Sequence, residues 1–213
     1  MTVPVPETDS VLVEGSALSG RRRVVHGFLH DRDGTPLVVS TRQPAENARR
    51  THRRVAGRES AETGGANEAS ARADGEPAPL VVDCVTGAVE ESPTDEPHTK
   101  YARHPSNLTS VGTKFTEFLE ARADGALVVG LDTVSPLLMY TDASAVFRFL
   151  HVVVQKATAS DCPVVVGFDG SAHGDRAVAQ LAPLFETVVE TRRAEDAREV
   201  RVARPEPTEW REL

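Results

Sequence analysis

The stretch SVLVEGSALSGRR, residues 10–22, decides how the rest of the chain is interpreted. Residues 11–14 are apolar except for the last, which predicts a short buried strand. Gly15 and Gly20 follow, five positions apart, and residues 21–30 place apolar side chains at helical spacing. The stretch therefore predicts a strand, a glycine-containing loop and a helix, in that order.

The two glycines keep the frame of a phosphate-binding loop, G-x-x-x-x-G-K-[ST]. In that motif the loop amides and the lysine hold phosphates, and the hydroxyl holds Mg²⁺. Here Arg21 stands in the lysine position and Arg22 in the Ser/Thr position. Arginine is a planar fork on a longer stem and does not replace lysine conservatively, and its side chain has no lone pair with which to ligate Mg²⁺. The loop therefore indicates the fold more firmly than the activity.

Length and composition set the broad class. The 213 residues suffice for one α/β domain with a core. The net charge is −8, from 24 basic and 32 acidic residues. A negatively charged protein repels the phosphate backbone, which argues against nucleic acid as a partner. Lysine occurs at only three positions, Lys100, Lys114 and Lys156. This acidic, arginine-rich composition is typical of proteins that stay soluble in high salt, so we expect a halophilic source; a GC-rich genome is the alternative explanation.

The cysteines and the apolar runs point to a compartment. Cys84 and Cys162 each lie within an apolar run, which predicts two buried thiols and no disulfide framework. The longest apolar runs are too short to cross a membrane, and residues 1–9 do not resemble a signal peptide. We therefore expect a cytoplasmic protein that does not associate with membranes.

Further along the chain, apolar runs of strand length alternate with segments of helical periodicity, which predicts a parallel sheet covered on both faces. Strands are expected at residues 11–14, 36–41, 79–83, 126–132, 163–169 and 187–191, and helices at residues 21–30, 44–55, 110–122, 142–157 and 175–185. Residues 199–203 and 209–213 are expected to form a terminal antiparallel pair. We expect the strand that begins at Val11 to be central, flanked by those that begin at Ala126 and Pro163.

Two polar segments, residues 56–78 and 87–106, interrupt this pattern. The first consists mainly of Gly, Ala, Glu, Ser and Arg, and the second contains three prolines and several acidic residues. Neither segment has enough apolar surface to offset the entropy of ordering it. We therefore expect one domain, residues 1–213, with disordered insertions at both places, the first of them sensitive to proteases.

Three segments together resemble the RecA superfamily, in particular its KaiC/RadA-like branch, over most of the chain outside the two insertions. The loop from Gly15 to Gly20 matches the Walker A position. ALVVGLDTVSPLLMY, residues 126–140, is similar to the Walker B strand and ends that strand at Asp132, while CPVVVGFDGSAH, residues 162–173, is similar to the next strand and its sensor loop. Uncharacterised haloarchaeal proteins of this kind carry a similar LDTVSPLL segment. The resemblance implies a RecA-like three-layer P-loop fold with a mainly parallel central sheet and a C-terminal antiparallel extension.

The resemblance also shows what is missing. Members of the branch use the loop lysine, the hydroxyl beside it, the Walker B aspartate and a carboxylate pair after the second strand. Residues 40–43 read STRQ, so the water-activating carboxylate is absent, and only Asp132 remains of these elements. Fold alone does not fix an activity.

Two hypotheses follow. The first is a non-catalytic RecA/KaiC-like regulatory or interaction protein of a haloarchaeon, with protein partners or self-association. The second is a nucleotide-binding protein or weak ATPase that uses Arg21 in place of lysine. Its site for ATP or another nucleotide would consist of Gly15, Ser16, Ser19, Gly20, Arg21 and Arg22. DNA recombination is disfavoured, because residues 135–140 after Asp132 are apolar rather than basic.

Several side chains outside the loop are further candidates. Asp132 is either a vestigial Mg²⁺ ligand or a residue that caps a turn. Asp169, Ser171 and His173 have the residue types of a hydrolase triad, but one short loop cannot align them, so a sensor or binding role is expected instead.

Two other features of the first helix are candidate ligand sites. His26 and His30 are four apart, as in zinc sites, but no third ligand is evident. We therefore interpret them as helix-surface histidines and predict no metal site. Residues 21–23 are three arginines at a helix start, which indicates either an anion site without Mg²⁺ or a solvated helix end.

The composition generates one prediction about stability. Because the acidic excess repels itself in dilute buffer and is screened by salt, we expect the melting temperature to rise steadily with KCl concentration. Thermal unfolding followed by circular dichroism, from dilute buffer to multi-molar KCl, measures this. A melting temperature that does not change across the series would contradict a halophilic origin.

Overall fold

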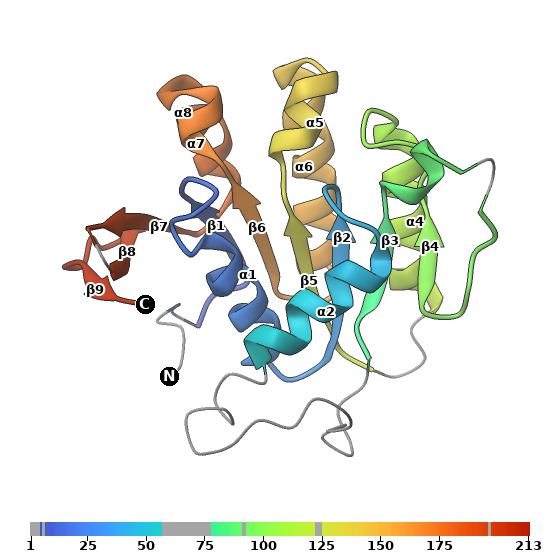
Figure 1. The fold of residues 1–213 in the computed structure, drawn as a ribbon, viewed down its shortest axis with the longest axis horizontal. Helices are drawn as coiled ribbons and strands as arrows, with labels where there is room; N and C mark the ends of the chain where they lie inside the picture. The colour runs from blue at the N-terminus through green and yellow to red at the C-terminus, as the bar shows by residue number, and fades with distance from the viewer. Residues whose placement is uncertain (1–4, 6, 57–77, 91–92, 122–124, 196) are drawn as a thin grey trace.

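The computed structural model describes residues 5, 7–56, 78–90, 93–121, 125–195 and 197–213. A nine-stranded sheet forms its centre, and helices cover both faces of that sheet (Figure 1). The strands are β1 (Ser10–Glu14), β2 (Thr35–Ser40), β3 (Leu80–Asp83), β4 (Thr99–Tyr101), β5 (Leu127–Asp132), β6 (Val164–Phe168), β7 (Thr187–Ala194), β8 (Ala197–Arg204) and β9 (Arg211–Glu212). The α-helices are α1 (Arg21–His30), α2 (Ala45–Ala56), α4 (Leu108–Ala121), α5 (Ser135–Tyr140), α6 (Ala143–Thr158), α7 (Gly170–His173) and α8 (Asp175–Leu181), with short 3₁₀ turns η1 (Thr86–Ala88) and η2 (Ala182–Leu184).

The strand order is β4-β3-β2-β5-β6-β1-β7-β8-β9. Every pairing from β4 across to β7 is parallel, and β8 and β9 add to β7 in antiparallel fashion. The predicted fold class is therefore confirmed: an α/β protein with a mainly parallel sheet and an antiparallel C-terminal extension.

The apolar strands supply two cores because successive side chains point to opposite faces of a sheet. In β1, Leu12 belongs to the core under α4, α6 and α8, whereas Val11 and Val13 belong to the core under α1 and α2. Burial on both faces explains why these strands read as continuous apolar runs instead of alternating ones.

The expected neighbours of β1 were partly wrong. β1 pairs with β6 on one side, with Ser10 opposite Val164, and with β7 on the other, with Val11 opposite Thr187. β5 lies beyond β6 and pairs with β2. The runs of β5, β6 and β7 are all apolar enough to be buried, so their pattern predicts burial but not the order in which the crossover helices place them.

The second predicted insertion, residues 87–106, contains structure that the sequence did not predict. β4 is an edge strand parallel to β3, and Thr99 and Ala102 are buried. Arg49 of α2 holds this edge by donating to the His98 carbonyl (2.6 Å) and to Thr99 Oγ1 (2.8 Å). A strand held by polar contacts with a distant helix leaves no apolar signature. Of the first predicted insertion, residues 57–77 lie outside the described residues, and Ala56 ends α2.

Two simpler expectations concern the cysteines and membranes. Cys84 and Cys162 are both buried, as predicted. In the part of the chain that the structure describes, no helix combines the length and the apolar character needed to span a bilayer.

The close packing of α1 on the sheet generates a prediction. A Cβ on Gly130 of β5 would lie 2.7 Å from Leu29 Cδ1, so Gly130→Ala must displace a buried side chain and should lower the free energy of unfolding by about 1–3 kcal/mol. Gly112 of α4 is the matched control, because its Cβ would meet only Phe149 Cε2 at 3.6 Å. Gly112→Ala should stabilise by about 0.5–1 kcal/mol, since alanine favours a helix. Urea unfolding of both variants measures the difference, and equal stabilities would contradict the packing of α1.

Candidate functional site

The carboxyl ends of the parallel strands meet at one edge of the sheet, where ligands of open α/β sheets bind. The register places Ser40 opposite both Asp83 and Asp132, and Glu14 opposite Phe168, directly before Asp169. The β1–α1 loop lies at the same edge (Figure 1). The structure therefore brings together the sequence-predicted candidates from β1, β5 and β6.

The β1–α1 loop is held by its own hydrogen bonds. The Gly15 amide donates to the Phe168 carbonyl (3.1 Å). Ser19, which is fully buried, donates to the Ser16 carbonyl (2.7 Å) and lies 2.6 Å from Thr191 Oγ1. Thr191 donates in turn to the Glu14 carbonyl (3.1 Å). These contacts tie the loop to β6 and β7.

Both loop glycines are required by neighbouring protein atoms. A Cβ on Gly15 would lie 2.1 Å from Thr191 Oγ1. Gly20 has φ 97°, and its Cβ would lie 2.6 Å from Leu213 Cδ2. Leu213 is fixed there because its carbonyl accepts from Arg23 Nη1 (3.0 Å). Packing against β7 and the C-terminus thus explains both glycines without any ligand.

The Arg21 guanidinium turns back into the loop. Arg21 is 4% exposed; its Nη1 donates to the Gly15 carbonyl and lies 3.5 Å from Asp169 Oδ2. Burial lowers the pKa of Arg21 from its ordinary value, while the carboxylates of Asp169 and Asp132 act in the opposite direction. The cation in the motif's lysine position therefore stabilises the protein's own carbonyl and carboxylate.

Asp132 is compensated by side chains of α1. Its carboxylate is buried, with Arg22 Nε 3.1 Å from Oδ2 and His26 Nε2 3.7 Å from the same atom. Burial alone would raise the pKa of Asp132, but the neighbouring His26, Arg22 and Arg21 outweigh it, so the pKa lies below its ordinary value. The side chain in the motif's hydroxyl position therefore contacts the aspartate that would share a Mg²⁺ with that hydroxyl.

The expectation that His26 lies on the helix surface was wrong: it is fully buried. α1 packs on the sheet and is also covered by α2, so more of its circumference is buried than its apolar face indicates. The covering residue is His52 of α2, whose ring centroid lies 5.6 Å from that of His26. His30 is partly exposed.

Sequence reasoning missed His52, although a signal was present. Ala45, Ala48 and His52 are buried at helical spacing and form the inner stripe of α2. Within the described residues, Nδ1 of His52, both ring nitrogens of His26 and Oδ2 of Asp132 lack a hydrogen-bond partner. Burial, with His26 and His30 nearby, lowers the pKa of His52 to about 3. Also within the described residues, no cluster of three His, Cys, Asp or Glu side chains can hold a metal ion.

The polar side chains at the ends of β2, β3 and β5 form hydrogen bonds with neighbouring protein groups. Thr41 Oγ1 donates to the Thr133 carbonyl (2.6 Å) and accepts from the Thr133 amide (2.9 Å). Asp83 accepts from the Ala45 amide at the start of α2 (2.7 Å) and from the Thr86 hydroxyl (2.8 Å). These groups fix the connections after the strands, and residues 40–43 at the end of β2 supply no carboxylate of their own.

The residues after β6 do not form a triad. Ser171 donates to Asp169 Oδ1 (2.6 Å), while the His173 ring stacks on Phe168, with centroids 5.7 Å apart. Burial and the nearby Glu190, Asp175 and Asp169 carboxylates raise the pKa of Glu14 beside them. The arrangement is an acidic corner next to Arg21.

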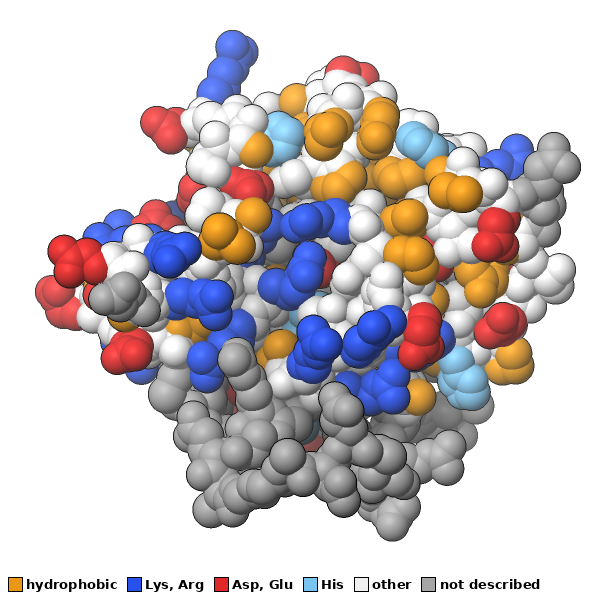
Figure 2. All heavy atoms as spheres, viewed as in Figure 1, with side chains coloured by type: hydrophobic (Ala, Val, Ile, Leu, Met, Phe, Trp, Pro, Cys, Tyr) orange, Lys and Arg blue, Asp and Glu red, His pale blue; other side chains and the backbone are white. Residues whose placement is uncertain are grey.

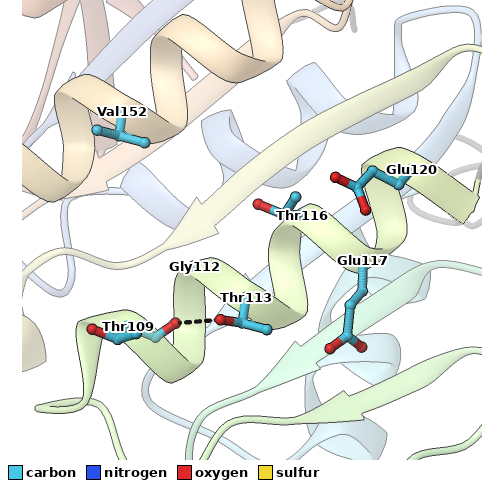
Figure 3. Close-up of a pocket in the computed structure, with 7 residues that line it drawn as sticks. All are labelled: Thr109, Gly112, Thr113, Thr116, Glu117, Glu120 and Val152. Atoms are coloured by element: carbon cyan, nitrogen blue, oxygen red, sulfur yellow. Dashed lines mark hydrogen bonds between the residues drawn. The ribbon is translucent and has the colours of Figure 1, made fainter.

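Two hollows lie elsewhere. One, of about 360 Å³, is bordered by Thr109, Gly112, Thr113, Thr116, Glu117, Glu120 and Val152, from α4 and α6 (Figure 3). Thr113 donates to the Thr109 carbonyl (2.9 Å), and Glu117 pairs with Lys100 (2.9 Å). The other, of about 620 Å³, lies between η1 and β4 and includes Asp95, which pairs with Lys114 (2.7 Å). Glu117, Asp95 and Lys114, which border the two hollows, are engaged in ion pairs.

Comparison with known proteins supports the fold. A family model described as "Family of unknown function (DUF7504)" matches residues 8–191. The KaiC-like protein PH0186 from the hyperthermophilic archaeon Pyrococcus horikoshii OT3 superposes with a TM-score of 0.59 at 10% identity, over 97% of this chain and 83% of that one. The uncharacterised P. horikoshii protein PH0321, solved in complex with an unknown peptide, gives a TM-score of 0.59 at 12% identity, over 92% of this chain and 84% of that one. No curated protein sequence matches.

The buried His52 generates a pH prediction. Folded His52 stays neutral down to about pH 3, whereas unfolded histidine takes up a proton below about pH 6.5. Stability is therefore full above about pH 6.5 and falls by about 1.4 kcal/mol per pH unit below it. From about pH 7.5 to 5.0, the native chain should lose about 2 kcal/mol more than His52→Leu.

Urea unfolding at the two pH values, in constant KCl, measures this loss. His98→Leu is the control, because His98 is exposed and should keep the pH dependence of the native chain. Equal slopes for the native chain and His52→Leu would show that His52 is not held neutral.

Proposed function

We propose that this chain, which belongs to the DUF7504 family of unknown function, is a non-catalytic regulatory or interaction protein built on a KaiC-like fold. The observation that carries the proposal is the direction of two side chains. Arg21 donates to the Gly15 carbonyl, and Arg22 lies 3.1 Å from Asp132. In a phosphate-binding loop, these two positions face the nucleotide and its Mg²⁺.

The chemistry of phosphoryl transfer explains why this matters. It requires charge neutralisation at the β- and γ-phosphates, a held Mg²⁺ and a positioned water. A Mg²⁺ at Asp132 would have to displace the Arg22 guanidinium and lie close to Arg21. No carboxylate follows β2, where Thr41 instead bonds to Thr133. We therefore regard the loop as a degenerate Walker A motif that has become a structural element.

The surviving glycines are compatible with this proposal. Gly15 and Gly20 would remain necessary in a chain that binds no nucleotide, because Thr191 and Leu213 occupy the space beside them. The glycine frame is therefore weak support for a retained nucleotide site.

Partner binding is the task we assign instead. The similar protein PH0321 was solved with an unknown peptide, which supports peptide or protein binding as a role for this fold. We extend the proposal to a haloarchaeal cytoplasm, because the chain combines a net charge of −8 with only three lysines.

The second candidate is a nucleotide-binding protein that uses Arg21. It is favoured by the start of α1, which has three arginines, no acidic residue in its first turn and no side-chain cap. Such a helix end attracts anions.

The two candidates predict different results with ATP. We expect no Mg²⁺-dependent hydrolysis by the native chain in multi-molar KCl, because the hydroxyl that would hold Mg²⁺ and the carboxylate that would position the water are both missing. Loss of charge stabilisation of the arginine-finger kind alone costs on the order of 10³–10⁵ in rate. Calorimetry with ATP and a phosphate-release assay, with and without Mg²⁺, measure binding and turnover. Arg21→Lys combined with Arg22→Thr tests whether the two arginines are what blocks the site.

Three results decide the matter. Hydrolysis by the native chain that Asp132→Ala abolishes would overturn the proposal. Binding without hydrolysis would favour a nucleotide sensor. Absence of both supports an interaction protein.

A further inference from the structure

A row of arginines crosses the face of this acidic protein that α1 and α2 cover. Figure 2 shows Lys and Arg side chains gathered across the middle of that face. The arginine row, as defined here, consists of Arg22 on α1, Arg42 between β2 and α2, and Arg50 and Arg54 on α2. Arg42, Arg50 and Arg54 are exposed, and Arg22 is partly exposed.

The geometry of α2 points these arginines outward. Ala45, Ala48 and His52 form its buried stripe, so Arg50 and Arg54 project on the opposite side. Arg50 contacts the neutral Asn47 side chain (2.6 Å). The nearby acid of α2, Glu46, already pairs with Arg53 (3.3 Å). Arg22 is compensated by Asp132, so within the described residues the positive charge of the row comes from Arg42, Arg50 and Arg54, on a chain of net charge −8.

An apolar ledge borders the row. The ledge consists of Met139 and Tyr140 at the end of α5, which are 71% and 58% exposed, and the Tyr140 ring contacts the His104 ring with centroids 4.9 Å apart. α5 begins three residues after Asp132, to which Arg22 is paired, so α5 starts at the same carboxyl edge of the sheet as the arginine row. In Figure 2 hydrophobic side chains gather next to the central basic side chains, on the side of α5.

We propose that the arginine row and the apolar ledge together bind an acidic peptide segment with hydrophobic anchors, contributed by a partner protein. The inference rests on the proposed function, which requires a partner but does not give its chemistry. Exposed Met and Tyr side chains bind apolar anchors, with Met adapting its shape to them. Arginines at the rim pair with carboxylates and reject basic competitors.

A peptide suits this surface better than nucleic acid does. Nucleic-acid affinity comes from many phosphate contacts, whereas only three arginines of the row do not pair with Asp132, and the net charge of −8 would repel a long polyanion elsewhere. The carboxylates of Glu14, Asp169 and Glu190 lie close together beside the β1–α1 loop and add negative charge there. A short acidic segment needs only the row.

The test uses the full chain and fluorescent peptides of about a dozen residues in about 1 M KCl, where long-range charge effects are screened. The first peptide alternates pairs of Asp or Glu with Leu or Phe. A second replaces every acid by serine, a third replaces every acid by lysine, and a single-stranded oligo-dT of equal charge represents nucleic acid. Fluorescence anisotropy measures affinity, and light scattering measures the oligomeric state.

We expect the acidic peptide to bind at least tenfold more tightly than the serine and lysine peptides. Arg42→Ser combined with Arg50→Ser should weaken it about fivefold or more, and Met139→Ser should weaken it about tenfold. Arg193→Ser and Val152→Ser are matched controls, because Arg193 is an exposed arginine of β7 and Val152 an exposed apolar residue of α6. Neither control should change the affinity.

Other results overturn the inference. Equal binding of the acidic and serine peptides, or no binding of the acidic peptide, would do so. Tighter binding of oligo-dT would identify a nucleic-acid surface, and a dimer lost in Met139→Ser would show that a second copy covers the ledge. The ATP measurements test the proposed function separately. If the acidic peptide does not bind and no ATPase activity is found, only this inference is wrong. Mg²⁺-dependent ATPase activity would instead contradict the proposed function.

Discussion

The buried charge of Asp132 constrains the carboxyl edge of the sheet. A carboxylate taken out of water is tolerated only when cations or donors compensate it. Here α1 supplies that compensation through Arg22, which lies 3.1 Å from Asp132, while Arg21, one position earlier, lies 3.5 Å from Asp169. The start of α1 must therefore sit directly above β5 and β6, and Gly15 and Gly20 permit this approach because the chain has no room for a Cβ at either position.

Most of the fold could be predicted because each helix and strand has a recognisable hydrophobic pattern within its own segment. Val11, Leu12 and Val13 are apolar on both faces, and the apolar face of α1 repeats with helical spacing. The order of the strands could not be predicted in full, since β6 separates β5 from β1 through long-range crossovers. β4 was missed for another reason: Arg49, from a helix fifty residues away in sequence, holds Thr99 by polar contacts that leave no hydrophobic pattern.

The candidate site was predicted as a set of positions but not as a set of contacts. Sequence spacing placed Arg21 and Arg22 in the phosphate and Mg²⁺ positions, and Asp132 at a strand end. It could not show that Arg21 folds back onto Gly15, because a rotamer depends on what surrounds it. His26 and His52 were hidden for a similar reason: each belongs to its own helix, and only the packing of α2 on α1 brings their rings together.

Contacts within the protein are sufficient to explain the conformation of the β1–α1 loop. Ser19, Thr191, Arg23 and Leu213 tie it to β7 and the C-terminal strands, so changing either glycine would disturb the antiparallel extension as well as the loop. Arg21 and Arg22 pair with Asp169 and Asp132, whereas the arginines on α2 and in the loop before it remain exposed. The proposed partner would therefore contact the surface of α2 instead of the β1–α1 loop.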